Sequence, residues 1–191
     1  MVVEFTGCCE NSGKDGQKRR KDYSFSEYHF YQIRMNEMTG YMAEMRSLVG
    51  HRTIIQCAAS IIVIDQEGRL LLGKRADNHL WGYAGGSVEI DEKIEDCARR
   101  ELFEEMGITA GKMDFFYVNS GPETHYIYPN GDEVSNVEII YICRDYAGDP
   151  KCGDGEMLDL RFFKPEEIDA EMISPPIRPV IAQYLNMIKQ K

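Results

Sequence analysis

The sequence lacks any hydrophobic run long enough to cross a bilayer, which takes roughly 20 consecutive apolar residues. Its N-terminal segment also lacks the basic start and apolar core of a secretory signal. We therefore expect a cytoplasmic protein with no membrane partner. Basic residues are scarce: the chain has 22 Lys and Arg but 32 Asp and Glu, which gives a formal net charge of −10. Nucleic-acid polymers bind clustered positive charge, so they are not predicted partners.

The six cysteines form no C-x-x-C pair, and no His-x-x-x-His motif accompanies them. A zinc site is therefore not expected. Buried or idle thiols in a reducing compartment account for these cysteines. An acidic chain can still bind a small anion if a divalent cation lies between the two.

A chain of 191 residues suits one folded domain. Residues 1–34 are interpreted as an N-terminal extension of uncertain order, and residues 35–191 as the domain. Apolar residues recur at helical spacing between Met35 and Leu48. This spacing predicts a helix that packs one face on the core.

The sequence after residue 53 predicts many short strands and only two or three helices. Two apolar runs, at 54–64 and 69–74, flank a turn signal at Asp65–Gly68, and Asn130–Gly131 indicates a second hairpin. Further elements are predicted as strands at 113–121, within 124–146 and at 157–163, and as helices from Pro165 and over 179–188.

A glycine-containing loop and a helix occupy the middle of the chain. The loop covers residues 76–86, and the helix is predicted from about Asp91 to Met106. Asp91 is a suitable N-cap, and Gly107 stands where a left-handed C-terminal glycine belongs.

Three glutamates crowd the C-terminal end of this helix. Glu101, Glu104 and Glu105 are spaced i, i+3 and i+4, so they share one helix face. The helix dipole disfavours carboxylates at that end by about 0.3–1 kcal/mol each, and the three repel one another. A bound cation would compensate them. Oxygen ligands without nearby Cys or His favour Mg²⁺ or Mn²⁺.

The alternative is that these are solvent-facing glutamates neutralised by basic neighbours, namely Lys93, Arg99 and Arg100. The surrounding spacing favours the cation. From Gly86 to Ile108 the chain reads glycine, five residues, glutamate, seven residues and then R-E-L-F-E-E-M-G-I. This segment resembles the Nudix box, G-x5-E-x7-R-E-U-x-E-E-x-G-U with U aliphatic, at every specified position.

The resemblance implies an α/β fold, namely an α/β/α sandwich with a mixed central sheet and a loop–helix–loop box. It also implies an enzyme that uses Mg²⁺ or Mn²⁺ to hydrolyse a pyrophosphate bond in a nucleoside diphosphate linked to another moiety. By the same resemblance Glu101, Glu104 and Glu105 bind the metal, the backbone carbonyl of Gly85 is a further ligand, and Arg100 orients the carboxylates.

Two residues are candidates for the base that takes a proton from the attacking water. Glu104 is one, and Glu156 in the loop "CGDGEMLDL" matches a loop glutamate that many relatives use. The substrate phosphates need positive side chains as well. Arg75, at the end of the second predicted strand, is the first choice, and Arg52 is the second.

One position departs from the family pattern. Most relatives have a proline before the paired glycines, whereas Tyr83–Ala84 precedes Gly85 here. Proline restricts φ. Altered loop rigidity, rather than lost activity, is therefore expected.

The loops around the box select the substrate. Pro122 lies one position from a proline of many ADP-ribose-cleaving relatives, so ADP-ribose or a nucleotide sugar is favoured over a nucleoside triphosphate. A non-catalytic nucleotide-binding regulator on the same fold is the alternative from another class. Tyr126 or Tyr128 could stack on the base, although core positions are favoured. A homodimer is possible, with the 35–48 helix as its candidate contact.

Overall fold

The structure, a computed structural model, describes residues 40–153 and 155–190. The predicted N-terminal extension, residues 35–39 of the first predicted helix, and Asp154 lie outside the described residues. Within the described ranges, no helix combines the length and apolar character that crossing a bilayer requires.

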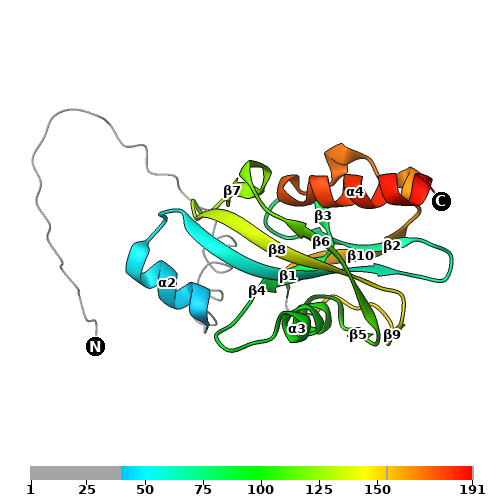
Figure 1. Ribbon diagram of the computed structural model, residues 1–191, viewed down its shortest axis with the longest axis horizontal. Helices are drawn as coiled ribbons and strands as arrows, with labels where there is room; N and C mark the ends of the chain where they lie inside the picture. The colour runs from blue at the N-terminus through cyan, green and yellow to red at the C-terminus, as the bar shows by residue number, and fades with distance from the viewer. Residues whose placement is uncertain (1–39, 154, 191) are drawn as a thin grey trace, which may run out of the picture. The chain divides into compact units, whose positions relative to one another are not determined.

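A mixed sheet forms the centre of the fold (Figure 1). Its order is β10-β2-β1-β8-β6, with β3 on β2, β4 on β1 and β7 on β8. β1 and β8 are parallel, and the other pairs are antiparallel, as a mixed central sheet requires. The bounds of the eight strands are β1 Ile54–Ile64, β2 Leu70–Arg75, β3 Trp81–Gly82, β4 Ala84–Ser87, β6 Met113–Asn119, β7 His125–Ile127, β8 Glu133–Cys143 and β10 Met157–Phe163; β5 Thr109–Ala110 and β9 Tyr146–Ala147 form a separate pair.

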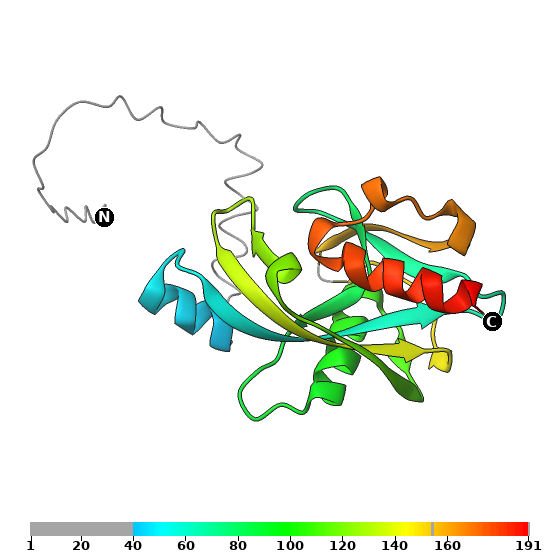
Figure 2. The same cartoon turned by 45° about the horizontal axis from the view of Figure 1, so that its top comes forward.

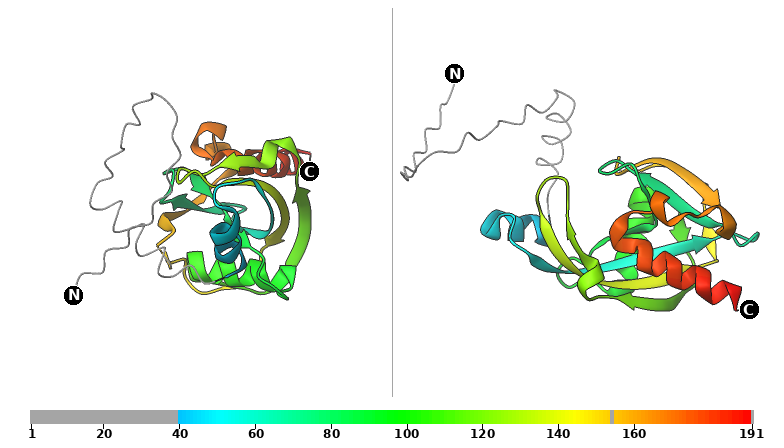
Figure 3. Two further views of the ribbon diagram at one scale, coloured as in Figure 1. Left: turned by 90° about the vertical axis from the view of Figure 1, so that its left-hand side faces the viewer. Right: turned by 90° about the horizontal axis from the view of Figure 1, so that it is seen from above.

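Helices cover both faces of this sheet, which confirms the predicted α/β/α sandwich (Figures 1 and 3). Side chains alternate along β1, so that Ile61 and Val63 pack with α3 while Ile62 and Ile64 pack with α4. The α-helices are α2 Tyr41–Val49, α3 Ile94–Met106 and α4 Arg178–Lys189; short 3₁₀ helices lie at Pro122–Thr124, Pro165–Glu167, Ala170–Met172 and Pro175–Ile177.

The predicted loop over residues 76–86 is wrong in part, because it contains β3 and the start of β4. Glycines mark loops locally, but here the backbone of β4 pairs with β1, with Gly85 opposite Ser60. A long-range ladder therefore overrides the local signal. This pairing fixes the two glycines at the edge of the sheet.

The box helix begins later than predicted. α3 starts at Ile94 with Lys93 as its N-cap, whereas Asp91 has a positive φ of 63° and caps nothing. The C-terminal end is as predicted: Gly107 has φ 69°, and its N–H donates to Phe103 O at 2.9 Å.

The chain after β9 closes the C-terminal end of α3. Lys151 N–H donates to Met106 O at 2.8 Å, and Gly153 N–H donates to Glu105 O at 3.2 Å. These two bonds satisfy helix carbonyls that have no partner within the helix. They also fasten the loop that leads to Glu156 onto the helix that carries the box.

The first described helix, α2, differs from its prediction. It spans Tyr41–Val49, and none of its side chains is fully buried; Leu48 is 73% exposed. Arg46 anchors it instead, donating to Arg52 O and Glu133 O at 2.7 Å each, so that α2 lies beside the start of β8 (Figure 2). The periodic apolar residues therefore do not pack on the core as expected.

Candidate active site

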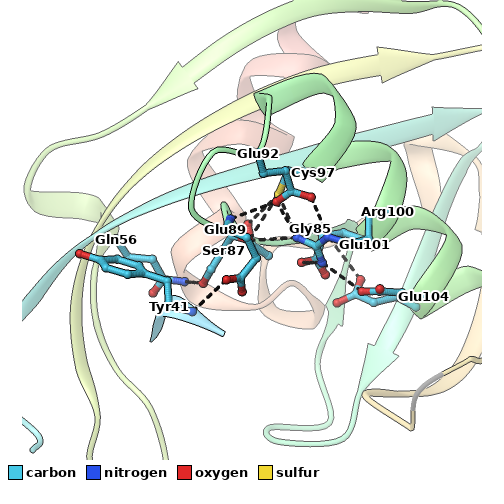
Figure 4. A network of polar contacts seen from close by, with 12 residues as sticks. Tyr41, Gln56, Gly85, Ser87, Glu89, Glu92, Cys97, Arg100, Glu101 and Glu104 are labelled. Atoms are coloured by element: carbon cyan, nitrogen blue, oxygen red, sulfur yellow. Dashed lines mark hydrogen bonds and ion pairs between the residues drawn. The ribbon is translucent and has the colours of Figure 1, made fainter. Parts of the chain in front are cut away.

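Arg100 lies at the centre of the box and binds three carboxylates at once (Figure 4). Its Nε and Nη2 donate to the two oxygens of Glu92 at 2.8 and 3.0 Å. Its Nη1 donates to Glu101 Oε1 at 2.6 Å and to Glu104 Oε2 at 3.0 Å. This geometry suits the orienting role expected of Arg100. It also means that one basic side chain offsets part of the acidic charge, as the alternative interpretation required.

The neighbouring carboxyls respond differently to this arginine. Hydrogen bonds from Arg100 lower the pKa of Glu92 to about 2. Burial raises the pKa of Glu101 to about 7, because desolvation and the charges of Glu104 and Glu156 outweigh the attraction of Arg100. Burial therefore disfavours the charged form of Glu101 even beside its arginine partner.

Two glycines bring the backbone of β4 against the glutamates. Gly85 N–H donates to Glu105 Oε2 at 3.3 Å, and Glu105 is only 2% exposed. Gly86 packs against Glu101, since a Cβ at Gly86 would lie 2.4 Å from Glu101 Oε1. The side chain of Glu104, by contrast, is 47% exposed. The three glutamates predicted to bind metal thus occupy three different settings on one helix end.

The donor set suits a hard divalent cation, because Glu101, Glu104 and Glu105 offer carboxylate oxygens. Among the residues that the structure describes, no three Asp, Glu, His or Cys side chains already converge with metal-binding geometry. Glu101 and Glu104 instead share the Nη1 of Arg100. Binding a cation therefore requires these two carboxylates to turn away from the guanidinium.

The raised pKa of Glu101 gives a pH-dependent stability. Its folded pKa of about 7 lies above the ordinary value of 4.5, so the folded state holds this proton more tightly. The resulting stabilisation is complete below pH 4.5 and is lost as the pH rises through about 7. We expect the free energy of unfolding of chelator-treated protein, measured in urea, to fall across this range.

Glu101→Gln provides the control for that measurement, because glutamine has no proton to release. Burial also raises the pKa of Glu138, whose contribution has the same sign and is present in both proteins. The variant should therefore lose less stability than the wild type between pH 4.5 and 7. Parallel curves for the two proteins would contradict the assignment to Glu101.

The ends of β2 and β10 bring Arg75 and Glu156 near one another, since Arg75 is paired with Met157. Glu156 O accepts the N–H of Ala76 at 2.8 Å. Arg75 donates to both oxygens of Asp77, at 2.9 and 3.0 Å. Burial lowers the pKa of Arg75, but hydrogen bonding to Asp77 and the charge of Glu105 outweigh it and raise that pKa overall. Arg75 therefore stays positively charged, is held in place by Asp77 and lies close enough to Glu105 to feel its charge. This arrangement fits the role in phosphate binding predicted for Arg75.

A cleft of about 650 Å³, open mouth included, lies beside the paired glycines. Gly85 and Gly86 form part of its wall. Tyr126 and Tyr128, for which core positions were favoured, line this cleft instead, with ring centroids 5.0 Å apart. The other polar side chains in the lining are Gln56, Ser60, Arg75, Asp77, Tyr83, Asn119, Thr124, Asn136, Glu138 and Ser174.

Sequence reasoning missed the buried carboxyl in this lining. Glu138 on β8 accepts hydrogen bonds from Ser60, Tyr83 and Asn119. Burial raises the pKa of Glu138, although these hydrogen bonds oppose the rise. The one signal in the sequence is a charged residue inside the apolar strand "VEIIYIC".

Arg52, the second candidate for phosphate binding, lies in the exposed turn between α2 and β1. It is not among the residues that line the cleft. Its backbone carbonyl accepts a hydrogen bond from Arg46, so the turn that contains Arg52 helps to anchor α2. The structure therefore does not bring Arg52 to the site.

Comparison with known proteins agrees with this fold and site. The NUDIX domain family profile matches residues 55–184. A MutT-like protein of Streptomyces ambofaciens is 30% identical over 111 residues, covering 58% of this chain and 65% of that protein. The nucleoside triphosphatase NudI of Salmonella newport is 31% identical over 114 residues, covering 56% of this chain and 80% of NudI.

Solved structures share the fold at lower identity. A MutT NUDIX hydrolase of Burkholderia pseudomallei superposes with a TM-score of 0.57 at 22% identity, covering 69% of this chain and 98% of that chain. The NUDIX domain of Shewanella oneidensis NrtR, complexed with ADP ribose, gives a TM-score of 0.58 at 14% identity, covering 76% and 98%. By its matching profile, its sequence relatives and its complete box, this chain belongs to the NUDIX domain family and is a Nudix hydrolase.

Proposed function

We propose that this chain hydrolyses a pyrophosphate bond of a small nucleotide, using Mg²⁺ or Mn²⁺ held by Glu101, Glu104 and Glu105. One observation carries the proposal: Gly85 and Gly86 are shared by the cleft and the box carboxylates. Because neither glycine has a side chain, we propose that the phosphate chain of a nucleotide in the cleft reaches the carboxylates past this backbone. The use of divalent cations is general in this family.

The residues of the box divide the chemistry between them. When bound, the cation offsets phosphate charge and lowers the pKa of its water. The N–H of Gly85 holds Glu105 in place. We propose the carbonyl of Gly85 as a further metal ligand. Arg100 keeps Glu101 and Glu104 close to one another until they bind the cation.

Two carboxylates can take the proton of the attacking water. Glu104 is the more accessible of the box glutamates, with its side chain 47% exposed. Glu156 is half-buried, and its charge acts on Glu101. Both therefore remain candidates for the base. Comparing Glu104→Gln with Glu156→Gln across pH separates them, because loss of the base removes the acid limb of the kcat profile.

Two substrate classes have support. ADP-ribose or a nucleotide sugar, favoured from the sequence, accords with the ADP ribose bound in the NrtR domain of the same fold. A nucleoside triphosphate accords with the closer sequence similarity to NudI, named a nucleoside triphosphatase. The test is a panel of both classes with Mg²⁺ or Mn²⁺, with products identified by mass. Nucleotide binding without turnover by any of them would instead favour the regulator alternative.

Replacing Arg75 by Gln is expected to raise KM at least about tenfold. The reason is that a charge-assisted hydrogen bond to phosphate contributes about 1.5–3 kcal/mol, and 1.4 kcal/mol corresponds to one decade. Arg52→Gln is the matched control, since Arg52 lies outside the cleft lining. Steady-state kinetics with the preferred substrate measure both. Equal effects of the two changes would remove Arg75 from the proposal.

A cytoplasmic location and a possible homodimer are also proposed. Leu48 on α2 and Ile55 on β1 are exposed apolar side chains that a second copy could cover. Sedimentation velocity of the purified chain tests the dimer, and cell fractionation tests the location.

A further inference from the structure

A carboxylate outside the box lies directly behind the paired glycines. Glu138 is 8% exposed. Ser60 Oγ donates to its Oε1 at 2.6 Å. Its Oε2 accepts from Tyr83 OH at 3.2 Å and from Asn119 Nδ2 at 3.3 Å. Both oxygens are therefore fixed by side chains from two other strands, β1 and β6, and from Tyr83 between β3 and β4.

This arrangement is costly for a fold that needs only packing at this position. Removing a carboxylate from water costs several kcal/mol, and apolar replacement of buried charge is often neutral or stabilising. The strand neighbours on the same face of β8, Ile140 and Ile142, are apolar core residues. A buried acid in such a strand, within a cleft, indicates a task other than stability.

Two partners of Glu138 enclose Gly85. Ser60 faces Gly85 across the β1–β4 ladder, so closely that a Cβ on Gly85 would lie 1.9 Å from Ser60 Oγ. Tyr83 precedes Gly85 by two residues and packs on the same face of the sheet as Ile62. Glu138 Oε1 therefore holds the residue opposite Gly85, while Oε2 holds the residue beside it in the chain.

The other side of Gly85 belongs to the box. Its N–H donates to Glu105 Oε2 at 3.3 Å. The position before the glycines is Ala84, which does not restrict φ as proline would. Anchoring of this backbone must therefore come from the β1–β4 pairing and from side-chain contacts, and the contacts of Glu138 with Ser60 and Tyr83 act on the side away from α3.

We propose that Glu138 is a positioning residue, whose carboxylate holds Ser60 and Tyr83 against Gly85 and thereby fixes the backbone on which Glu105 and the bound cation depend. The inference rests on the proposed function for its catalytic consequence, and on the geometry alone for its effect on the Gly85 backbone.

Tyr83→Phe is the first test, because it removes one hydroxyl and preserves the buried ring. We expect faster amide hydrogen exchange of residues 84–87 and about 10–100-fold weaker Mn²⁺ binding by calorimetry, the range typical of lost outer-shell contacts. We also expect a lower kcat with KM changed less than about twofold. Tyr184→Phe, in the same buried cluster on α4, is the matched control and should leave all three unchanged.

Glu138→Gln is the second test, since glutamine replaces one of the two acceptor oxygens by a donor. It should reproduce the effects of Tyr83→Phe, and the double variant should add little to either change. Unchanged exchange and Mn²⁺ affinity in Tyr83→Phe would overturn the proposal. So would a Glu138→Gln variant that changes KM differently for different bases at unchanged kcat, since Glu138 would then select the base.

The two proposals fail separately. Without hydrolysis of any nucleotide by the wild type, the proposed function is lost, but hydrogen exchange at residues 84–87 still decides whether Glu138 fixes this backbone. With normal turnover and unaltered exchange in both variants, the proposed function stands and the positioning role is wrong.

Discussion

Glu105→Gln is expected to lower kcat at least about 100-fold while leaving the fold intact. Loss of an outer-shell partner already costs about 10–100-fold in metal sites, and a direct ligand should cost more. Glutamine has nearly the same size, and its amide oxygen can still accept the Gly85 N–H. The buried position, 2% exposed, loses a charge that water does not screen. The metal-free variant should therefore be as stable as the wild type or more so.

The measurement has two parts, kcat with the preferred substrate and urea unfolding in the presence of chelator. Glu44→Gln on α2, an exposed glutamate away from the box, serves as the matched control and should change neither. Full activity in Glu105→Gln would refute the metal role. An inactive protein that also unfolds early would instead make Glu105 a structural residue.

Gly86→Ala is expected to reduce metal affinity and kcat at least about tenfold, with less than about 1 kcal/mol lost in stability. The new Cβ would lie 2.4 Å from Glu101 Oε1, and its nearest neighbours are all carboxylate atoms of Glu101. Since this is the end of a side chain, the carboxylate can move away. The new methyl group then occupies the space beside Gly86 and restricts where the Glu101 carboxylate can lie to bind a cation.

Gly85→Ala offers the contrast, because its Cβ would meet Ser60 Oγ at 1.9 Å and the Ser60 Cα at 2.8 Å. The Ser60 backbone belongs to β1 and cannot move as freely, so overpacking of about 1–3 kcal/mol is expected. Urea midpoints and kcat for both alanine variants test the pair. A fully active Gly86→Ala would show that the position of Glu101 is unimportant for catalysis.

The parts of the fold that depend on short-range geometry could be predicted from the sequence. The spacing of Glu101, Glu104 and Glu105 identifies a helix end, because residues three and four apart are neighbours on any α-helix. Gly107 marks the end of α3, since its left-handed φ suits glycine. The turn at Asn130–Gly131 joins β7 to β8 for the same kind of reason.

Features that depend on residues distant in sequence could not be predicted. β4 exists because it pairs with β1, which nothing within the predicted loop indicates. Arg75 ends β2 and Arg52 shortly precedes β1, and only the folded chain shows that Arg75 lines the cleft while Arg52 does not. The partners of Glu138 come from three separate segments of the chain, so its environment cannot be read from a single stretch of sequence.

The loop fastened to the end of α3 has a consequence for engineering. Because main-chain groups at Lys151 and Gly153 make the bonds to Met106 and Glu105, side-chain substitutions there preserve the attachment. Gly153 itself is the exception, since a Cβ would lie 1.8 Å from Glu104 O. Insertions or deletions between Gly153 and Glu156, by contrast, change the length of the loop segment that sets the distance between the Glu156 and Glu101 carboxylates. Libraries that randomise this segment should therefore hold its residue count constant.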